Sequence, residues 1–274
     1  MLISVIVPSK YEKTDISALK FDISKQKIAF ETEVIKSCGI NPPGKVRNQG
    51  VTKSKGEILV FIDCDIRLGN ELFLANLVNP LLEDKHIGIT CASIRIPPDS
   101  SRFQKQYASQ MLHAESPIVD KITDVFVASS ACCALRRNLF QENKGFNEHI
   151  IRGEDSLISY EIKKRGYCVV LIPNTWCYHP QPRNIWEVVK INIRNGNGVA
   201  FVDTFYPQLN IDVNPEGIVH TATKQNISQR IKRFVNAFLK AVFKLKFLLI
   251  ISKITYAVGY CYGSLKCKIL KRSR

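Results

Sequence analysis

The sequence has no Cys-x-x-Cys pair, although it contains nine cysteines among 274 residues. The cysteines are scattered and odd in number, so their spacing predicts neither a zinc site nor a disulfide framework. We expect free thiols in a reducing cytosol, because disulfides persist mainly in oxidising compartments. Internal repeats and low-complexity tracts are also absent, which argues against a repeat architecture.

The N-terminus lacks the basic lead and the long apolar core of a signal peptide. Its apolar run, residues 1–7, is short, and we expect it to form the first strand of a sheet. Pro8 should end that strand, because proline cannot donate a hydrogen bond to a ladder. The length and an apolar content of 45% suit one sizeable α/β domain with an appendage.

Acidic residues are missing from the end of the chain. Residues 224–274 contain nine Lys, four Arg and no Asp or Glu, so they carry 13 of the formal net charge of +15. The remaining chain is nearly neutral. We therefore expect one main domain over residues 1–223 and a separate basic helical tail over residues 224–274.

One buried strand is predicted to run directly into two acids. Residues 58–62 form an apolar, partly β-branched run, typical of a strand covered on both faces in a mainly parallel sheet. Ligands bind past the carboxyl ends of such strands, where Asp63 and Asp65 stand, on one side by strand alternation. Neighbouring carboxylates repel unless a cation lies between them, and oxygen ligands suit Mg²⁺ or Mn²⁺. A turn in which the acids cap backbone amides is the open alternative.

A short basic helix is expected just before this strand, within residues 45–57. Here the sequence resembles the family 2 glycosyltransferases of GT-A fold. Their ordered pattern of Arg-Asn-x-Gly, Gly-Glu, apolar strand and Asp-x-Asp is matched by Arg47, Asn48, Gly50, Gly56, Glu57, Asp63 and Asp65.

The resemblance implies a Rossmann-like, mainly parallel sheet flanked by helices, and a UDP- or GDP-sugar as donor. The residues it assigns to the donor are Pro8, Ser9, Lys10, Arg47, Asn48 and Asp63. A second strand is expected over residues 30–35. Family members usually end this strand in acids that contact the nucleotide base, whereas this chain has Lys36, Ser37 and Cys38, which leaves the base open.

A second acidic cluster, Glu154 and Asp155, precedes a predicted helix that has basic residues in its last turn and stops at Gly166. Acids at a helix start also cap it, and this alternative stays open on spacing alone. The string matches the family's Glu-Asp motif, in which the Asp is the general base that deprotonates the acceptor. The resemblance thus gives Asp155 that role, with Glu154 beside it. The small residues of 125–135 resemble the family's floor under the acceptor sugar.

His179 follows a predicted strand over residues 169–172. A lone histidine is usually structural, but in GT-A enzymes that this chain resembles, a histidine here is often a metal ligand. The resemblance therefore assigns the metal to Asp65, Asp63 and His179. Residues 181–186 are similar to the Gln-x-x-Arg-Trp motif of processive synthases, with a different spacing, so we expect transfer of a single sugar.

The tail has the pattern of a basic amphipathic helix that lies in a membrane interface. Its apolar face is Ile231, Phe234, Val235, Phe238, Val242, Leu245 and Leu249, and its polar face is Arg233, Asn236, Lys240 and Lys244. Residues 247–265 are long enough to span, but Lys253 near mid-span costs about 2.5–3.5 kcal/mol, so a shallow segment is equally open. A helical pair packed on the catalytic domain and a homodimer contact are the alternatives.

These observations predict an inverting glycosyltransferase at the cytoplasmic face of a membrane. We expect a glycan or lipid-linked acceptor, or a cell-surface polysaccharide precursor, and an anionic membrane rather than nucleic acid as the partner of the tail. A haloacid-dehalogenase-like phosphatase is one alternative, but such enzymes have Thr or Val two residues after the second Asp, where this chain has Arg67. A non-catalytic membrane-binding protein of the same fold is the other.

Overall fold

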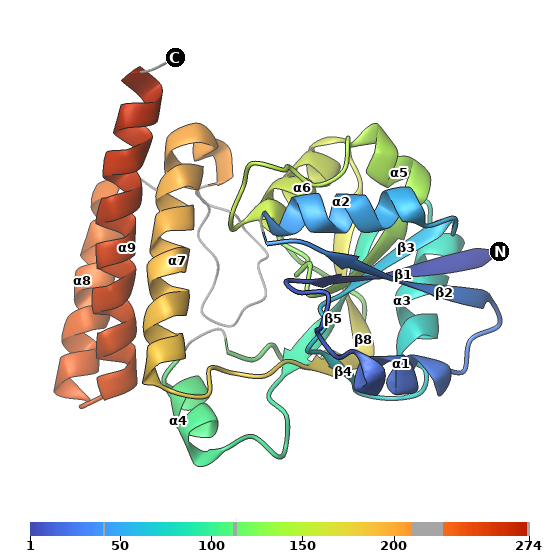
Figure 1. Ribbon diagram of the computed structural model, residues 1–274, viewed down its shortest axis with the longest axis horizontal. Coiled ribbons are helices and arrows are strands. Elements are labelled where there is room, and N and C mark those ends of the chain that lie inside the picture. The colour runs from blue at the N-terminus through green and yellow to red at the C-terminus, as the bar shows by residue number, and fades with distance from the viewer. Residues whose placement is uncertain (41, 112–113, 210–226, 273–274) are drawn as a thin grey trace.

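The computed structural model describes residues 1–40, 42–111, 114–209 and 227–272. In this part of the chain, one eight-stranded sheet is covered by helices on both faces, and three long helices stand beside it (Figure 1). The strands are β1 (Leu2–Ser9), β2 (Glu31–Cys38), β3 (Ile58–Ile62), β4 (Arg67–Leu68), β5 (Ile87–Arg95), β6 (Thr123–Asp124), β7 (Cys132–Arg136) and β8 (Cys168–Tyr178).

The helices alternate with the strands through the first part of the chain. They are α1 (Ser17–Ser24), α2 (Pro43–Lys53), α3 (Phe73–Glu83), α4 (Arg102–Gln110), α5 (Arg137–Glu142), α6 (Glu154–Lys164), α7 (Ile185–Phe205), the short 3-10 helix η1 (Pro207–Leu209), α8 (Ile227–Phe243) and α9 (Phe247–Arg272).

The sheet is mainly parallel, as predicted. Its strand order is β2-β1-β3-β7-β5-β8-β4, with β6 paired to β8. The ladders of β1 with β2, β1 with β3 and β5 with β8 are parallel, and β7 runs antiparallel between β3 and β5. The carboxyl ends of the parallel strands therefore meet at one edge, which faces α7 (Figure 1).

The core lies on both faces of the sheet, and β3 divides between them by strand alternation. Ile58, Val60 and Ile62 pack in the cluster that includes α1 and α3, whereas Leu59 and Phe61 pack in the cluster that includes α2, α5 and α6. All five side chains are at most 2% exposed. Each contributes about 1.5–3 kcal/mol by burial, so the end of β3 is held firmly in place.

Three predicted strands are longer in the structure. β2 runs to Cys38 and not to residue 35, and the other two are β1 and β8. β1 continues through Pro8 to Ser9, because by then its ladder with β3 has ended at Ile6 and the remaining pairing is with β2 alone. Pro8 has no N–H to donate, but at this position β1 has only one neighbouring strand, so the sheet tolerates the proline. β8 reaches Tyr178, and a register shift lets it pair with β5 along this extension. His179 follows the strand end directly.

The tail packs against the rest of the chain through α7. α7 and α9 lie side by side in parallel, with α8 beside them (Figure 1). A Cβ atom on Gly196 would lie 2.1 Å from the carbonyl oxygen of Tyr256, and one on Gly259 would lie 2.1 Å from that of Ile193. Only glycine allows this backbone approach. The hydroxyl of Tyr260 also donates to Oδ2 of Asp203 at 2.8 Å.

One face of α9 thus packs as expected for the alternative in which the tail is a helical pair packed on the catalytic domain. The segment Phe247–Lys271 is also long and apolar enough to cross a membrane, by length and composition. The predicted boundary between residues 223 and 224 lies outside the described residues.

Candidate active site

The acid pair stands in a turn where β3 ends. The backbone N–H of Asp63 donates to the carbonyl of Ala131 at 2.9 Å, and that of Ile66 donates to the carbonyl of Asp63 at 3.1 Å. Because the chain turns here, strand alternation no longer decides where Asp65 points. The two acids contact different partners, and both partners come from distant parts of the chain.

Arg47 on α2 is the partner of Asp63 and also of Glu154. Its Nη2 lies 2.7 Å from Oδ1 of Asp63, and its Nη1 lies 2.9 Å from Oε1 of Glu154. The Arg47 side chain is 4% exposed, and its guanidinium lies 5.6 Å from the ring centroid of Phe146. A buried charge of this kind is stable only when it is paired, so Arg47 fixes the end of β3 against the start of α6.

The second acidic pair opens α6, as predicted. Gly153, with φ of 96°, precedes the helix, and Glu154 and Asp155 form its first turn. Burial raises the pKa of Glu154, and the charge of Asp155 adds to this, while Arg47 opposes both. The hydroxyl of Ser130 lies 3.5 Å from Glu154.

The two carboxylate oxygens of Asp155 have different surroundings. Oδ1 accepts the backbone N–H of Ser156 at 2.8 Å, which is a local contact at the helix start. In the described ranges, Oδ2 has no hydrogen-bond partner. One oxygen thus supports the helix, and the other is available to a ligand.

Asp65 faces His179 because β4 begins two residues after it. Arg67 of β4 pairs with Tyr178 at the end of β8, so the residues just before β4 lie beside the residues just after β8, which include His179. The distance from Oδ1 of Asp65 to Nε2 of His179 is 3.9 Å. Burial raises the pKa of Asp65 even though 52% of its side chain is exposed, and His179 acts in the opposite direction.

The tautomer of His179 follows from its other ring nitrogen. Nδ1 lies 3.0 Å from the carbonyl oxygen of Pro180. A carbonyl only accepts, so Nδ1 carries the proton, and in the neutral ring Nε2 presents a lone pair toward Asp65. This arrangement, in which the outer nitrogen donates to a carbonyl, is the one that orients metal-binding histidines.

These two residues fit a divalent cation with room for further ligands. Adjacent ligands on an octahedral ion with bonds of about 2.1 Å lie about 3 Å apart, so the 3.9 Å separation needs only a small closure. Over the described residues, no group of three or more candidate ligands is assembled. Carboxylate and imidazole donors on one side leave the remaining positions to oxygen atoms of a ligand.

The loop after β1 is held in place by the residues that replace the family's acids. Nζ of Lys36 donates to the carbonyls of Glu12 and Thr14, the latter at 2.8 Å. The hydroxyl of Ser9 and the thiol of Cys38 lie 3.1 Å apart. A cavity of about 510 Å³ opens at this loop, lined by Tyr11, Glu12, Lys13 and Thr14. Pro8, Ser9 and Lys10 lie where β1 enters the loop.

Asn48, the second residue of the basic motif, connects α2 to the loop after α5. Its Nδ2 donates to the carbonyl of Phe146 and to Glu148, both at 2.9 Å, and its Oδ1 accepts the N–H of Phe146 at 3.0 Å. These bonds hold Phe146 against Arg47. The predicted contact of Asn48 with the donor stays a prediction.

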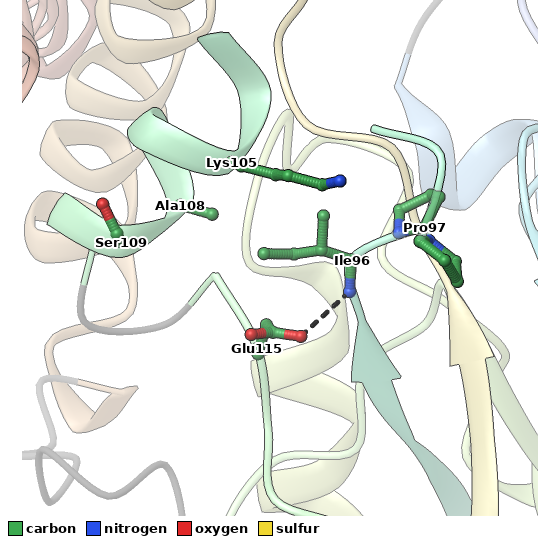
Figure 2. Close-up of a pocket in the computed structure, with 7 residues that line it drawn as sticks. Ile96, Pro97, Lys105, Ala108, Ser109 and Glu115 are labelled. Carbon is green, nitrogen blue, oxygen red and sulfur yellow. Dashed lines mark hydrogen bonds between the residues drawn. The ribbon is translucent and has the colours of Figure 1, made fainter. Parts of the chain in front are cut away.

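A smaller cavity of about 330 Å³ lies between α4 and the end of β5 (Figure 2). Lys105 extends across it toward Pro97, and Glu115 closes one side by accepting the N–H of Ile96 at 3.1 Å (Figure 2). Glu115 also pairs with Arg95 at 3.1 Å, and the N–H of His179 donates to the carbonyl of Arg95 at 2.9 Å. The cavity therefore adjoins the His179 side of the site.

The structure adds arginines that the sequence did not indicate. Arg152 immediately precedes Gly153, and Arg194 lies on α7, the helix that faces the strand ends (Figure 1). Arg183 is near enough to Asp65 to lower its pKa against the effect of burial. The sequence signal that could have indicated this packing is the Asn-Gly-Asn-Gly run inside α7, because glycines within a helix often mark a place where another segment of the chain comes close.

A mainly parallel sheet with acids at the ends of β3 and at the start of α6 is the arrangement of GT-A glycosyltransferases, and the comparisons agree. The chain belongs to the family described as Glycosyltransferase like family 2, whose model matches residues 12–198. Curated protein sequences give no match.

Two solved structures show the same fold. A mannosyltransferase of Pyrobaculum calidifontis in complex with GDP-Man and Mn²⁺ is similar over 96% of this chain and 86% of its own, with 17% identity and a TM-score of 0.56. GalNAc-T7 with UDP, GalNAc and Mn²⁺ is similar over 86% of this chain and 54% of its own, with 14% identity and a TM-score of 0.51. Family and fold together support a glycosyltransferase and favour it over the phosphatase alternative.

Proposed function

We propose that this protein is an inverting glycosyltransferase that moves one sugar from a UDP- or GDP-sugar to a hydroxyl of a lipid-linked or polysaccharide-precursor acceptor. One observation carries the proposal. Arg47 contacts both Asp63 and Glu154, so the two acidic sites stand within the span of a single guanidinium. One site can hold a leaving group while the other holds a base.

Asp155 is the base in this proposal. Its free carboxylate oxygen accepts the proton of the acceptor hydroxyl. At the same time, the hydroxyl oxygen of the acceptor forms the new bond to the anomeric carbon. The bond from the anomeric carbon to the diphosphate breaks, and its electron pair leaves with the diphosphate oxygen. Attack from the face opposite the leaving group inverts the anomeric centre.

Asp65 and His179 hold the metal in this proposal, with Asp63 beside them. Mg²⁺ or Mn²⁺ bound there would neutralise charge on the leaving diphosphate. Arg47 keeps Asp63 oriented, and Pro8, Ser9 and Lys10 border the loop that would receive the nucleotide. The two solved structures named above were determined with Mn²⁺ and nucleotides, which supports the same ligands here.

A thermal-shift screen of UDP and GDP, each with and without Mn²⁺, tests the donor site. A ligand at a hundred times its Kd stabilises a protein by about 2.7 kcal/mol, so a clear metal-dependent shift is expected with one nucleotide. Turnover with the matching sugar nucleotide, and NMR of the product anomer, then test transfer and inversion. Binding without turnover on a panel of acceptors would favour the non-catalytic alternative.

We further infer that the tail rests on the cytoplasmic face of an anionic membrane. Apolar side chains with helical spacing are exposed on both tail helices. They are Ile231, Val235, Leu239, Val242 and Phe243 on α8, and Phe247, Ile254, Val258, Tyr262, Leu265 and Ile269 on α9. Residues 227–272 contain no acid, and an anionic leaflet favours each nearby Lys or Arg by about 1 kcal/mol.

The contacts of α9 favour a position in the membrane surface over a span. Its inner face touches the backbone of α7 at Gly196, and Tyr260 bonds to Asp203 on the same helix. A spanning α9 would have to leave α7 or take charged residues such as Arg194 and Asp203 into the bilayer, which is costly. An in-plane α9 keeps these contacts and places its outer stripe in lipid.

A further inference from the structure

We propose that Arg152 and Arg194 form an anion subsite where the loop before α6 packs on α7, and that this subsite takes a phosphate group of a substrate. This inference rests on the proposed function for the identity of the substrates, but not for the existence of the site. The phosphate could belong to the donor or to the acceptor.

The two arginines are brought together by the packing of the loop before α6 on α7. Gly198 of α7 is so close to Arg152 that an added Cβ would lie 2.8 Å from the Cβ of Arg152 and 3.6 Å from its backbone nitrogen. Arg194 lies one helical turn before Gly198, hence on the same face of α7. Arg152 and Arg194 therefore stand next to each other, where the loop before α6 meets α7.

Neither arginine has a partner for its guanidinium. Within the ranges that the structure describes, no salt bridge or side-chain hydrogen bond involves Arg152 or Arg194. The nearby acid Glu154 is already bonded to Arg47. The pKa of Arg194 is lowered, first by burial, although the residue is partly exposed to solvent, and second by the charge of Arg152, so the two cations stand close enough to repel each other.

Two arginines with free donor groups are the usual means of binding phosphate, because each guanidinium fork can make two parallel hydrogen bonds to its oxygens. Arginine stays charged under all ordinary conditions, so the repulsion cannot be relieved by losing a proton. A bound dianion would relieve it. The same subsite borders the reaction centre, since Asp155 is the third residue after Arg152.

The competing explanation is that both arginines only balance the charge of the acids from a distance. In that case, removing either one would change the stability of the protein but not its affinity for anions. The direct probes are inorganic phosphate and pyrophosphate, which need no glycosyl transfer. Measurements without added metal, at constant ionic strength set with chloride, separate specific binding from screening.

The full-length protein should be stabilised by phosphate or pyrophosphate in thermal-shift and calorimetric titrations. Arg194→Gln and Arg152→Gln should each weaken binding about tenfold to a hundredfold, which is the range for hydrogen bonds to charged groups. Lys164→Gln is the matched control, because it removes the same charge from an exposed residue at the far end of α6, and it should bind as the parent does. Equal affinity in parent and arginine variants, or no stabilisation beyond chloride, would overturn the proposal.

The source of the phosphate follows from a second titration with UDP and GDP. A matching loss of nucleotide affinity in Arg194→Gln assigns the subsite to the donor diphosphate. Unchanged nucleotide affinity, together with weakened inorganic phosphate, assigns it to a phosphate on the acceptor. Failure of nucleotide binding in the parent would count against the proposed function and leave the phosphate result intact.

Discussion

Nε2 of His179 lies 3.9 Å from Oδ1 of Asp65, although β3 and β8, which precede these residues, are separated in the sheet by β7 and β5. The two-residue strand β4 makes this contact possible, because it leaves the acid pair and joins the end of β8. A metal bound here would connect two distant parts of the chain.

Substitution of Asp65 with Ala should abolish metal-dependent stabilisation by UDP or GDP and leave the fold intact. The reason is that half of this side chain is exposed, so its loss removes a ligand but little packing. Thermal shifts with and without Mn²⁺ measure the effect. Asp120→Ala, an exposed acid away from the site, serves as the control. A variant that binds nucleotide and metal as tightly as the parent would place the site elsewhere.

Asp155→Asn should lower kcat by about 10²- to 10⁴-fold, the usual contribution of a general base. Donor binding should hardly change, because the amide keeps the local bond to Ser156 and the metal ligands are untouched. Steady-state kinetics and a nucleotide titration separate these effects. A parallel loss of donor affinity would make Asp155 a structural cap or a donor ligand instead.

Arg47→Met should destabilise the protein by about 3–5 kcal/mol, because it leaves two acids without their shared buried partner. Urea unfolding monitored by circular dichroism gives the difference. Adding Glu154→Gln to this variant should recover part of the loss, since one of the uncompensated charges is then removed. A single-variant loss below about 1 kcal/mol would show that the pairs behave as surface salt bridges.

The contribution of Glu154 to stability should fall as the pH rises. Its pKa in the folded protein is raised above the ordinary value of 4.5, so the native state holds this proton more tightly than the unfolded chain does. The stabilisation is complete below about pH 4.5 and is lost as the pH passes the folded pKa. The free energy of unfolding of the parent minus that of Glu154→Gln should therefore decrease from pH 4 to pH 8. An increase over this range would mean that Arg47 lowers the pKa.

The tail should carry the full-length protein to the top of a density gradient with anionic liposomes, and not with neutral ones. Replacing Ile254, Val258 and Tyr262 on the exposed stripe of α9 with Ser should abolish flotation, because these side chains are 49%, 56% and 61% exposed. Substitutions are preferable to a chain ending near residue 223, since that truncation would also uncover α7. Ser at Ile118 and Ile122, exposed apolar residues outside the tail, is the matched control. Flotation of the α9 variant like the parent would exclude this face as the anchor.

Much of the fold could be predicted because local signals and tertiary packing agree. The apolar run before Asp63 is β3 with the predicted bounds, and Glu154 opens α6 with Gly166 after its end. Propensity and stop signals act within a few residues, so one sequence suffices to find them. The resemblance to family 2 then supplied the roles.

Contacts between distant residues could not be predicted in the same way. Arg47 was expected near the crevice, but nothing in its neighbours shows that it joins Asp63 to Glu154. The orientation of Asp65 toward His179 depends on β4, which is too short to give a pattern. Arg152 and Arg194 come together only because α7 packs on the loop before α6, and helix packing is decided by tertiary contacts.

The glycine contacts between α7 and α9 determine how far the active site stands from a membrane to which α9 is bound. Helices in ordinary contact stand 8–10 Å apart, and in this pair the close contacts join residues 193–200 of α7 to residues 256–263 of α9. A membrane-bound α9 would therefore hold α7, and the strand ends that α7 faces, at a constant height above the lipid. Acceptors would be selected by the distance between their membrane anchor and their reactive hydroxyl. The helix pair would therefore set the length of acceptor that the enzyme can use, in addition to binding the enzyme to the membrane.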